Sequence, residues 1–146
     1  DWAGDVSHLP GLLAQADFVV VATPLTDATY GLIGPRELAL MKPDAYLINP
    51  ARGPIVNEQG LYRALRDKTI GGAAIDVWWD YPDGEVTMAP ASRFDFASLD
   101  NVLMTPHISG GTSGTGARRA RVVSGNVDRL YKGLPLINVV PDLFRA

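Results

Sequence analysis

Short apolar runs alternate with segments of helical periodicity along this chain of 146 residues. Runs rich in β-branched, aromatic and small apolar residues at 17–22, 45–48, 73–77 and 102–104 predict four strands. Because these runs are continuous and do not alternate with polar residues, we expect strands that are buried on both faces. The spacing of strands and helices predicts a parallel sheet with right-handed crossovers.

Helical patterns fill the segments between and after these strands. Short helices are predicted at 9–16 and 36–41, and a third helix begins after Asn57, whose side chain is suited to an N-cap. A long final helix is predicted over 112–131, whereas 78–99 has no clear periodicity and is predicted to be a loop. The predicted fold class is α/β, a parallel-sheet, doubly wound domain of the Rossmann type.

Composition and charge exclude several classes of function. The net charge of −3 and the pI near 5.2 argue against nucleic acid or an anionic membrane as the partner. The chain has no cysteine, so it has no disulfide, thiolate nucleophile or cysteine-ligated zinc, which fits the cytoplasm. No apolar run approaches the ~20 residues of a membrane span, and no signal peptide opens the chain.

Polar groups follow the predicted strands and converge on one edge of the sheet, because the carboxyl ends of parallel strands share an edge. The groups are Thr23-Pro24-Leu25-Thr26 after the first strand, Asn49 and Arg52 after the second, Asp76 in the third, and His107 with Ser109 and Gly110 after the fourth. Each alone has a structural interpretation: a loop histidine, a solvated arginine or a buried aspartate. Their convergence favours a functional site.

The chemistry available to these residues is limited. Arg52 offers a planar fork for a carboxylate, His107 exchanges a proton near neutral pH, and Asp76 accepts hydrogen bonds from an amide. The small residues Ala51 and Gly110 leave room for a flat ring. Nothing predicts a metal site. The combination suits hydride transfer between a nicotinamide and a small 2-hydroxy or 2-oxo acid.

Several segments resemble the D-isomer-specific 2-hydroxyacid dehydrogenases, in the order and spacing of that family. They read ADFVVVATPLTDATYGLIG, LALMKPDAYLINPARGPIVNEQGLYRAL, GGAAIDVW and NVLMTPHISG. The resemblance implies an oxidoreductase that uses NAD or NADP, acts on a small 2-hydroxy/2-oxo acid and forms a homodimer as a full-length protein. It implies neither a nucleic-acid nor a membrane partner.

The resemblance also implies roles for individual residues. Arg52 would bind the substrate carboxylate, His107 would be the acid/base that protonates the carbonyl oxygen, and Asp76 would hold the nicotinamide carboxamide. The remaining candidate cofactor contacts are Pro24, Thr26, Pro50, Ala51, Ser109 and Gly110. Pro50 stands where the family often has Thr, so a hydroxyl contact would be absent there.

The chain departs from the family pattern in two places. Most relatives carry a Glu five residues after the aspartate, where it pairs with the histidine; this chain has Tyr81 there, so His107 should be less biased toward its protonated form. Asp80 and Glu85 are the other candidates to replace that Glu. The second departure is that no G-x-G-x-x-G loop for a pyrophosphate occurs in 1–146.

These departures lead us to expect that 1–146 is the second half of a dinucleotide-binding domain, without the G-x-G-x-x-G half and the substrate domain. Residues 112–146 would form the helix and tail that return to the substrate domain. We expect such a fragment to be inactive alone. The alternatives are a formate dehydrogenase-like oxidoreductase, a non-catalytic NAD-sensing module like the corepressors built on this fold, and a folded remnant without activity.

Overall fold

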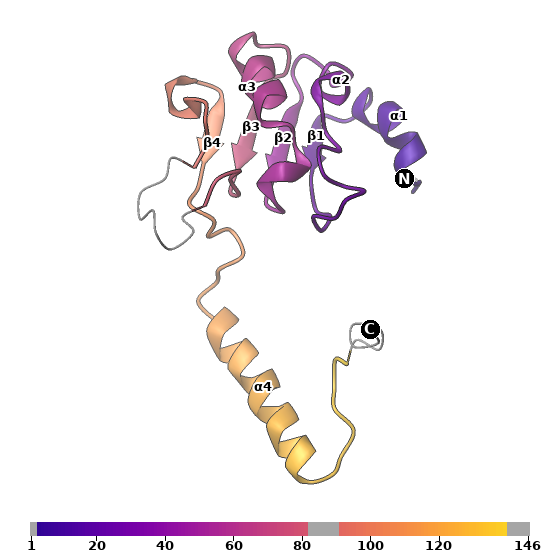
Figure 1. Ribbon diagram of the computed structural model, residues 1–146, viewed down its shortest axis with the longest axis vertical. Helices are drawn as coiled ribbons and strands as arrows, with labels where there is room; N and C mark the ends of the chain where they lie inside the picture. The colour runs from indigo at the N-terminus through magenta and orange to yellow at the C-terminus, as the bar shows by residue number, and fades with distance from the viewer. Residues whose placement is uncertain (1–2, 82–90, 140–146) are drawn as a thin grey trace. The chain divides into compact units, whose positions relative to one another are not determined.

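The computed structural model describes residues 3–81 and 91–139. The chain divides into two compact units, one up to Gly110 and one from Gly111 (Figure 1). The first unit contains the sheet and the shorter helices, and the second contains one long helix and its tail. Each unit is described by itself below.

The first unit is built on a four-stranded, all-parallel sheet in the order β1-β2-β3-β4. The strands are β1 (Phe18–Val20), β2 (Tyr46–Asn49), β3 (Gly72–Ile75) and β4 (Val102–Met104). The predicted parallel α/β fold is confirmed, and each predicted strand is present. The third strand is shorter than predicted, since it ends at Ile75 and places Asp76 directly after the strand.

Short helices precede the first strand and connect the others. They are η1 (Val6–His8), α1 (Leu9–Leu13), α2 (Pro35–Leu38), η2 (Gly53–Ile55), α3 (Glu58–Arg66) and η3 (Phe96–Ser98). The predicted cap of α3 is confirmed, because the Asn57 side-chain oxygen accepts a 2.8 Å hydrogen bond from the Gly60 N–H. The apolar stripe of α3, at Leu61, Ala64 and Leu65, is buried in the core.

The core lies on one face of the sheet, where α2 and α3 cover it (Figure 1). Val19, Leu47 and Ala73, which are paired across β1, β2 and β3, point into this core and are buried. The next row, which includes Val20 and Leu103, faces away and is 56% and 66% exposed. The prediction of strands buried on both faces is therefore wrong for the described residues, since their helices cover one face only.

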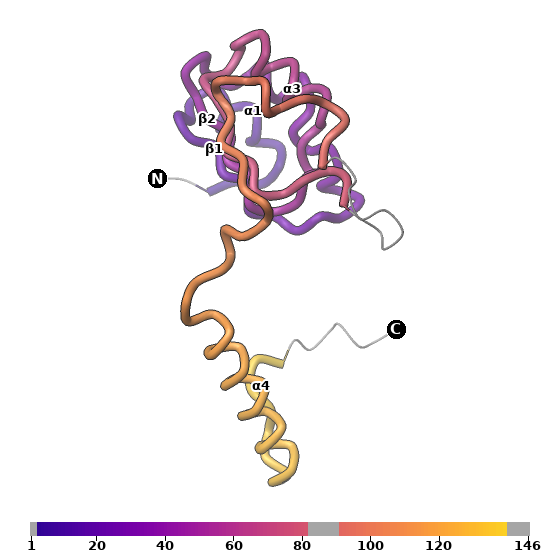
Figure 2. Tube along the Cα trace, turned by 90° about the vertical axis from the view of Figure 1, so that its left-hand side faces the viewer, coloured from indigo at the N-terminus to yellow at the C-terminus, as the bar shows by residue number. Residues whose placement is uncertain are grey.

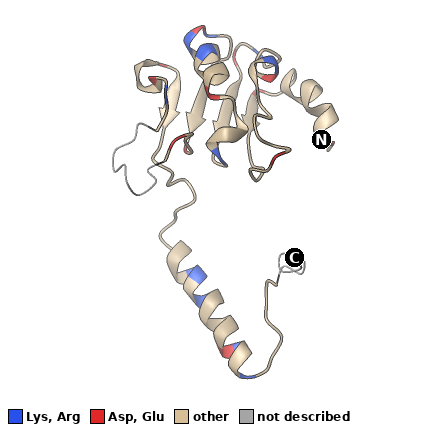
Figure 3. Cartoon of the chain, in the orientation of Figure 1, with Lys and Arg blue, Asp and Glu red and all other residues tan. Residues whose placement is uncertain are grey.

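The second unit contains α4 (Thr115–Tyr131), somewhat shorter than the predicted 112–131 helix. Gly133, at a φ of +65°, ends the helix, and the tail turns back along it (Figure 2). The turn is held by Asn126, whose amide exchanges two 3.0 Å hydrogen bonds with the Ile137 main chain. Basic side chains dominate the first half of α4, and acidic and basic groups are mixed elsewhere (Figure 3). Within 3–81 and 91–139, no helix is long and apolar enough to span a membrane.

Candidate functional site

A cavity of about 490 Å³ lies at the carboxyl ends of β1 and β2. Four of the predicted site residues line it, namely Pro24, Pro50, Ala51 and Arg52. The parallel arrangement of the two strands brings these loops together, as the sequence predicted. The other lining residues, from Val21 to Leu25, are apolar or small except for Thr23. This lining suits a flat, largely apolar ring beside one cationic group.

Asn49 shapes the loop that carries Arg52. The side chain of Asn49 is buried at the end of β2, where its oxygen accepts from the Ala51 N–H and its amide donates to the Arg52 carbonyl, both at 3.0 Å. These two bonds fix the turn that delivers Arg52 to the cavity. The Arg52 guanidinium donates to the Ala51 carbonyl at 2.6 Å and is exposed. In the described part of the chain it has no acidic partner, so its charge is available to an anion.

Asp76 binds the loop that follows β4. Its Oδ1 accepts from the Thr105 hydroxyl at 2.5 Å and from the Ile108 N–H at 2.9 Å. Its Oδ2 accepts from the Ser109 hydroxyl at 2.6 Å and from the Ser109 N–H at 3.1 Å. A carboxylate offers about four lone-pair positions, so these four donors saturate Asp76. The loop is thereby tied to the end of β3 on either side of His107.

The hydrogen bonds keep Asp76 ionised although it is buried. Burial raises the pKa of the Asp76 carboxyl, but the side chains of Ser109 and Thr105 and the N–H groups of Ile108 and Ser109 outweigh that effect and hold the pKa well below its usual range. The same bonds hold the chain on both sides of His107, which lies between Thr105 and Ile108 and has a left-handed backbone with a φ of +59°. Left-handed backbone at a non-glycine residue persists where surrounding contacts determine it.

Tyr81 is the hydrogen-bond partner of His107. The Tyr81 Oη lies 3.1 Å from Nδ1 of His107, and the Trp78 N–H donates to the same Oη at 3.0 Å. The two rings are 5.7 Å apart and tilted by 51°. Among the candidates to replace the family's Glu, the structure thus brings Tyr81 to His107, whereas Asp80 is 3.8 Å from Arg93 and lines a second cavity of about 430 Å³. Glu85 lies outside the described residues.

Trp78 contacts both the loop that carries Arg52 and the loop that carries His107. Its indole N–H donates to the Thr105 carbonyl at 3.1 Å, and its backbone packs against Gly53, next to Arg52. A Cβ at Gly53 would overlap the main-chain carbonyl of Trp78, so only glycine permits this approach. A continuous set of contacts therefore runs from the Arg52 loop through Trp78 to Tyr81 and the His107 loop.

Two predicted site residues have less definite surroundings. The Thr26 N–H donates to the Thr29 hydroxyl at 2.8 Å, which places Thr26 in a local turn and not on the cavity wall. A Cβ built on Gly110 would meet no atom within 4 Å, so the space beside it is open. No cluster of three His, Cys, Asp or Glu suited to a metal occurs within 3–81 and 91–139.

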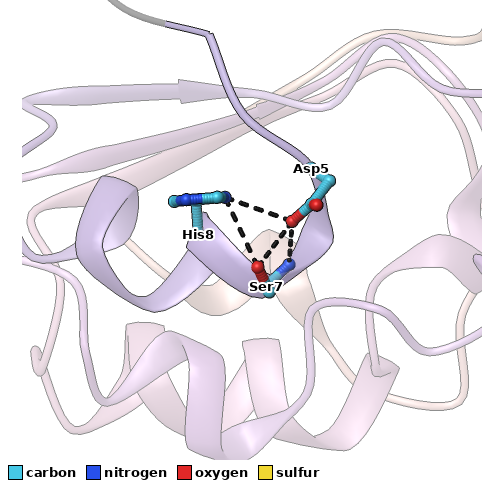
Figure 4. Close-up of polar contacts among 3 residues, drawn as sticks. All are labelled: Asp5, Ser7 and His8. Atoms are coloured by element: carbon cyan, nitrogen blue, oxygen red, sulfur yellow. Dashed lines mark hydrogen bonds and ion pairs between the residues drawn. The ribbon is translucent and has the colours of Figure 1, made fainter.

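The second histidine has a carboxylate partner. Nδ1 of His8 lies 3.1 Å from Oδ1 of Asp5, the N-cap of η1, and Ser7 contacts the same oxygen (Figure 4). Hydrogen bonds from the Ser7 side chain and N–H, followed by His8, lower the pKa of Asp5. Although Ser, His and Asp meet here, both partners contact one ring nitrogen, so the cluster caps a helix and is not arranged as a catalytic triad.

Sequence reasoning missed the parts of the site that come from tertiary contacts. Trp78 and Thr105 were not singled out, and the bond from Tyr81 to His107 spans 26 residues. The available signal was the aromatic content of Trp78-Trp79-Asp80-Tyr81, which is unusual for a solvated loop.

The family model and similar known proteins point to the same family of dehydrogenases. Residues 3–109 match the model of the D-isomer specific 2-hydroxyacid dehydrogenase, NAD binding domain. A glyoxylate reductase of Thermococcus gammatolerans is 42% identical over 125 residues, which is 86% of this chain and 35% of that protein. A glyoxylate/hydroxypyruvate reductase B of Enterobacter agglomerans is 41% identical over 138 residues, 94% of this chain and 41% of that protein. The chain thus spans about two-fifths or less of these relatives.

A solved structure shows the same arrangement of the chain. The D-isomer specific 2-hydroxyacid dehydrogenase from Xanthobacter autotrophicus Py2, crystallised with NADPH and MES, superposes with a TM-score of 0.72 at 38% identity. The superposition covers 92% of this chain and 52% of that one. The family model covers most of the described sheet unit, as the sequence resemblance implied. The chain belongs to the D-isomer specific 2-hydroxyacid dehydrogenase family, and residues 3–109 match the NAD-binding domain of that family.

Proposed function

We propose that the full-length protein reduces small 2-oxo acids to 2-hydroxy acids with NADH or NADPH, and that glyoxylate and hydroxypyruvate are its first candidate substrates. The observation that carries this proposal is that Arg52, which has no acidic partner among the described residues, lines the β1–β2 cavity, while the His107 loop is fixed to the end of β3. The names of the two reductases described above support the choice of substrates.

The residues of the cavity fit a nicotinamide. Ala51 and Pro24 offer small, apolar surfaces to a ring. When bound, the dihydronicotinamide would supply the hydride that reduces the carbonyl carbon. Everything else in the reaction falls to the protein: holding the acid, orienting it and providing one proton.

Arg52 and His107 divide these tasks. The guanidinium of Arg52 would bind the carboxylate of the 2-oxo acid through two parallel N–H···O bonds, which sets both its position and its orientation. His107, protonated at both ring nitrogens, would give one proton to the carbonyl oxygen as negative charge develops there. The imidazole then returns to its neutral form and recovers a proton from solvent, which its exposed position allows.

Asp76 would act mainly through the His107 loop. Its four lone-pair positions are taken by Thr105, Ile108 and Ser109, so a carboxamide that bound Asp76 would have to displace one of these donors. The carboxamide contact implied by the family resemblance therefore stays a prediction, in competition with the loop.

An absorbance assay tests the proposed reaction. The full-length protein is mixed with NADH or NADPH and a panel of glyoxylate, hydroxypyruvate and pyruvate, and loss of the reduced cofactor is followed. We expect turnover with at least one 2-oxo acid. If the reduced cofactor is consumed with none of these acids, the proposal is contradicted. Formation of NADH from formate and NAD would instead favour the formate dehydrogenase-like alternative.

A further inference from the structure

Each of the two histidines of this chain has an oxygen at the same distance from Nδ1, but the two oxygens differ in chemistry. In both cases Nδ1 lies 3.1 Å from an oxygen, which belongs to the Asp5 carboxylate for His8 (Figure 4) and to the Tyr81 phenol for His107. An ionised carboxylate only accepts hydrogen bonds, whereas a phenol both donates and accepts. The protonation pattern of the two rings should therefore differ.

The surroundings of the Tyr81 hydroxyl favour donation toward His107. The Trp78 N–H can only donate, so the Tyr81 Oη accepts this bond at 3.0 Å and keeps its own hydrogen for another acceptor. Nδ1 of His107, at 3.1 Å, lies within reach of this hydrogen and accepts it when the neutral ring carries its own hydrogen on Nε2. A donor that already accepts one hydrogen bond is polarised and donates more strongly, so the two bonds reinforce each other.

We propose that Tyr81 is a positioning residue for His107: its hydroxyl, held by the Trp78 N–H, donates to Nδ1 and leaves the hydrogen of the neutral imidazole on Nε2. When the ring takes up a proton, Nδ1 gains a hydrogen and the phenol turns to accept it. Nε2 of the protonated ring is then the nitrogen that faces away from Tyr81 and can give its proton to the carbonyl oxygen. This transfer leaves the remaining hydrogen on Nδ1, bonded to the phenol oxygen, and proton exchange with solvent restores the resting tautomer. Only this transfer rests on the proposed function.

The other contacts of the loop are compatible with this role. In the described part of the chain, the titratable groups that hydrogen-bond to the 105–109 loop are Tyr81 and Asp76. Asp76 binds the residues before and after His107, so it fixes the left-handed backbone there and not the ring. Tyr81 remains as the group that orients the ring.

A phenol next to Nδ1 differs from a carboxylate in charge. A carboxylate there favours the protonated ring, because opposite charges attract, whereas a neutral phenol can bond to the ring in either charge state. Since the reduction needs the protonated ring, Tyr81→Glu should extend activity to higher pH. This difference separates a positioning role from a merely structural one.

Nitrogen NMR tests the proposal without any need for activity. The 146-residue chain, labelled with [15N]histidine, is examined at a pH where both rings are neutral, and His8→Gln assigns the signals. We expect hydrogen on Nε2 in His107 and on Nδ1 in His8. Tyr81→Phe should leave His107 as a mixture of tautomers, and Tyr131→Phe, at an exposed position of α4, should change nothing. Hydrogen on Nδ1 of His107, or an unchanged signal in Tyr81→Phe, would overturn the proposal.

Kinetics of the full-length protein give a second readout. Tyr81→Phe should lower kcat roughly tenfold with little change in KM, since one positioning hydrogen bond is lost. Tyr81→Glu should keep activity and move the alkaline fall of kcat to higher pH by about one unit. An unchanged kcat in Tyr81→Phe would show that the hydrogen bond between Tyr81 and His107 does not contribute to catalysis. If the wild type reduces no 2-oxo acid, the proposed function fails while the NMR result still decides the role of Tyr81.

Discussion

Replacement of Asp76 by Asn should destabilise the sheet unit by a calculable amount. Asn keeps one acceptor oxygen, which can still bind Thr105 and Ile108. Its amide would meet the Ser109 N–H and hydroxyl; the hydroxyl can rotate to accept, whereas the N–H loses Oδ2 and keeps only its longer 3.2 Å contact with Oδ1. The loss of one good hydrogen bond costs about 1 kcal/mol, and the loss of charge from the remaining bonds adds about 1–2 kcal/mol. We expect a loss of about 2–3 kcal/mol at pH 7.

The pH dependence of this loss follows from the lowered pKa of Asp76. A carboxyl whose folded pKa is depressed stabilises the fold above its unfolded pKa, near 3.9, and that contribution disappears as pH falls toward the folded value. Below about pH 4 the wild type should therefore lose roughly 1 kcal/mol per pH unit through this group. The Asn variant has no such group, so its deficit should be about 1 kcal/mol smaller at pH 3 than at pH 7.

Urea unfolding followed by tryptophan fluorescence measures both quantities. All three tryptophans precede Gly110, so the signal reports on the sheet unit. Asp27→Asn, at an exposed position, serves as the matched control and should change stability by less than about 0.5 kcal/mol. A deficit for Asp76→Asn below 1 kcal/mol at pH 7, or one that is equal at pH 3 and pH 7, would refute the reasoning.

Three further predictions concern the Arg52 loop and the cofactor. Arg52→Ala should raise KM for the 2-oxo acid by roughly 10- to 100-fold, because a charge-assisted pair with the substrate carboxylate is lost. Arg63→Ala on α3 is the control. An unchanged KM in Arg52→Ala would show that Arg52 does not bind the carboxylate. Gly53→Ala should destabilise the sheet unit by about 1–3 kcal/mol in urea, because its Cβ overlaps the Trp78 carbonyl, whereas Gly11→Ala in α1 should be neutral or stabilising. Calorimetry of the 146-residue chain with NAD should show no micromolar binding, since the sequence has no glycine-rich loop for the pyrophosphate, and a micromolar Kd would contradict this.

Local sequence patterns were sufficient to predict the four strands and the four α-helices of the described residues, but not their three short 3-10 helices, of which η3 lies in the predicted 78–99 loop. The cap at Asn57 and the strand at 102–104 were both predicted at the positions where the structure has them. Strand composition could not show which face of the sheet is covered, because the apolar run at 17–22 is the same whether one or two layers of helices pack on it. Phe18 and Val20 are therefore more exposed than predicted.

The site was predictable only as far as topology determines it. The rule that parallel strands end at one edge brought Pro24 and Arg52 to the same cavity. The partners of Asp76 and His107 depend on how the loops after β3 and β4 fold against each other, and these loops have no periodicity from which to predict them. The bond between Tyr81 and His107 is consequently a result of the structure.

His107→Gln in the full-length protein tests the central claim most directly. Gln retains a hydrogen-bond donor but has no proton to transfer at neutral pH, so kcat for glyoxylate or hydroxypyruvate should fall by at least roughly 100-fold while KM changes little. His8→Gln, in the η1 cap, should retain full activity. A His107→Gln enzyme with kcat within about twofold of the wild type would show that His107 is not the proton donor.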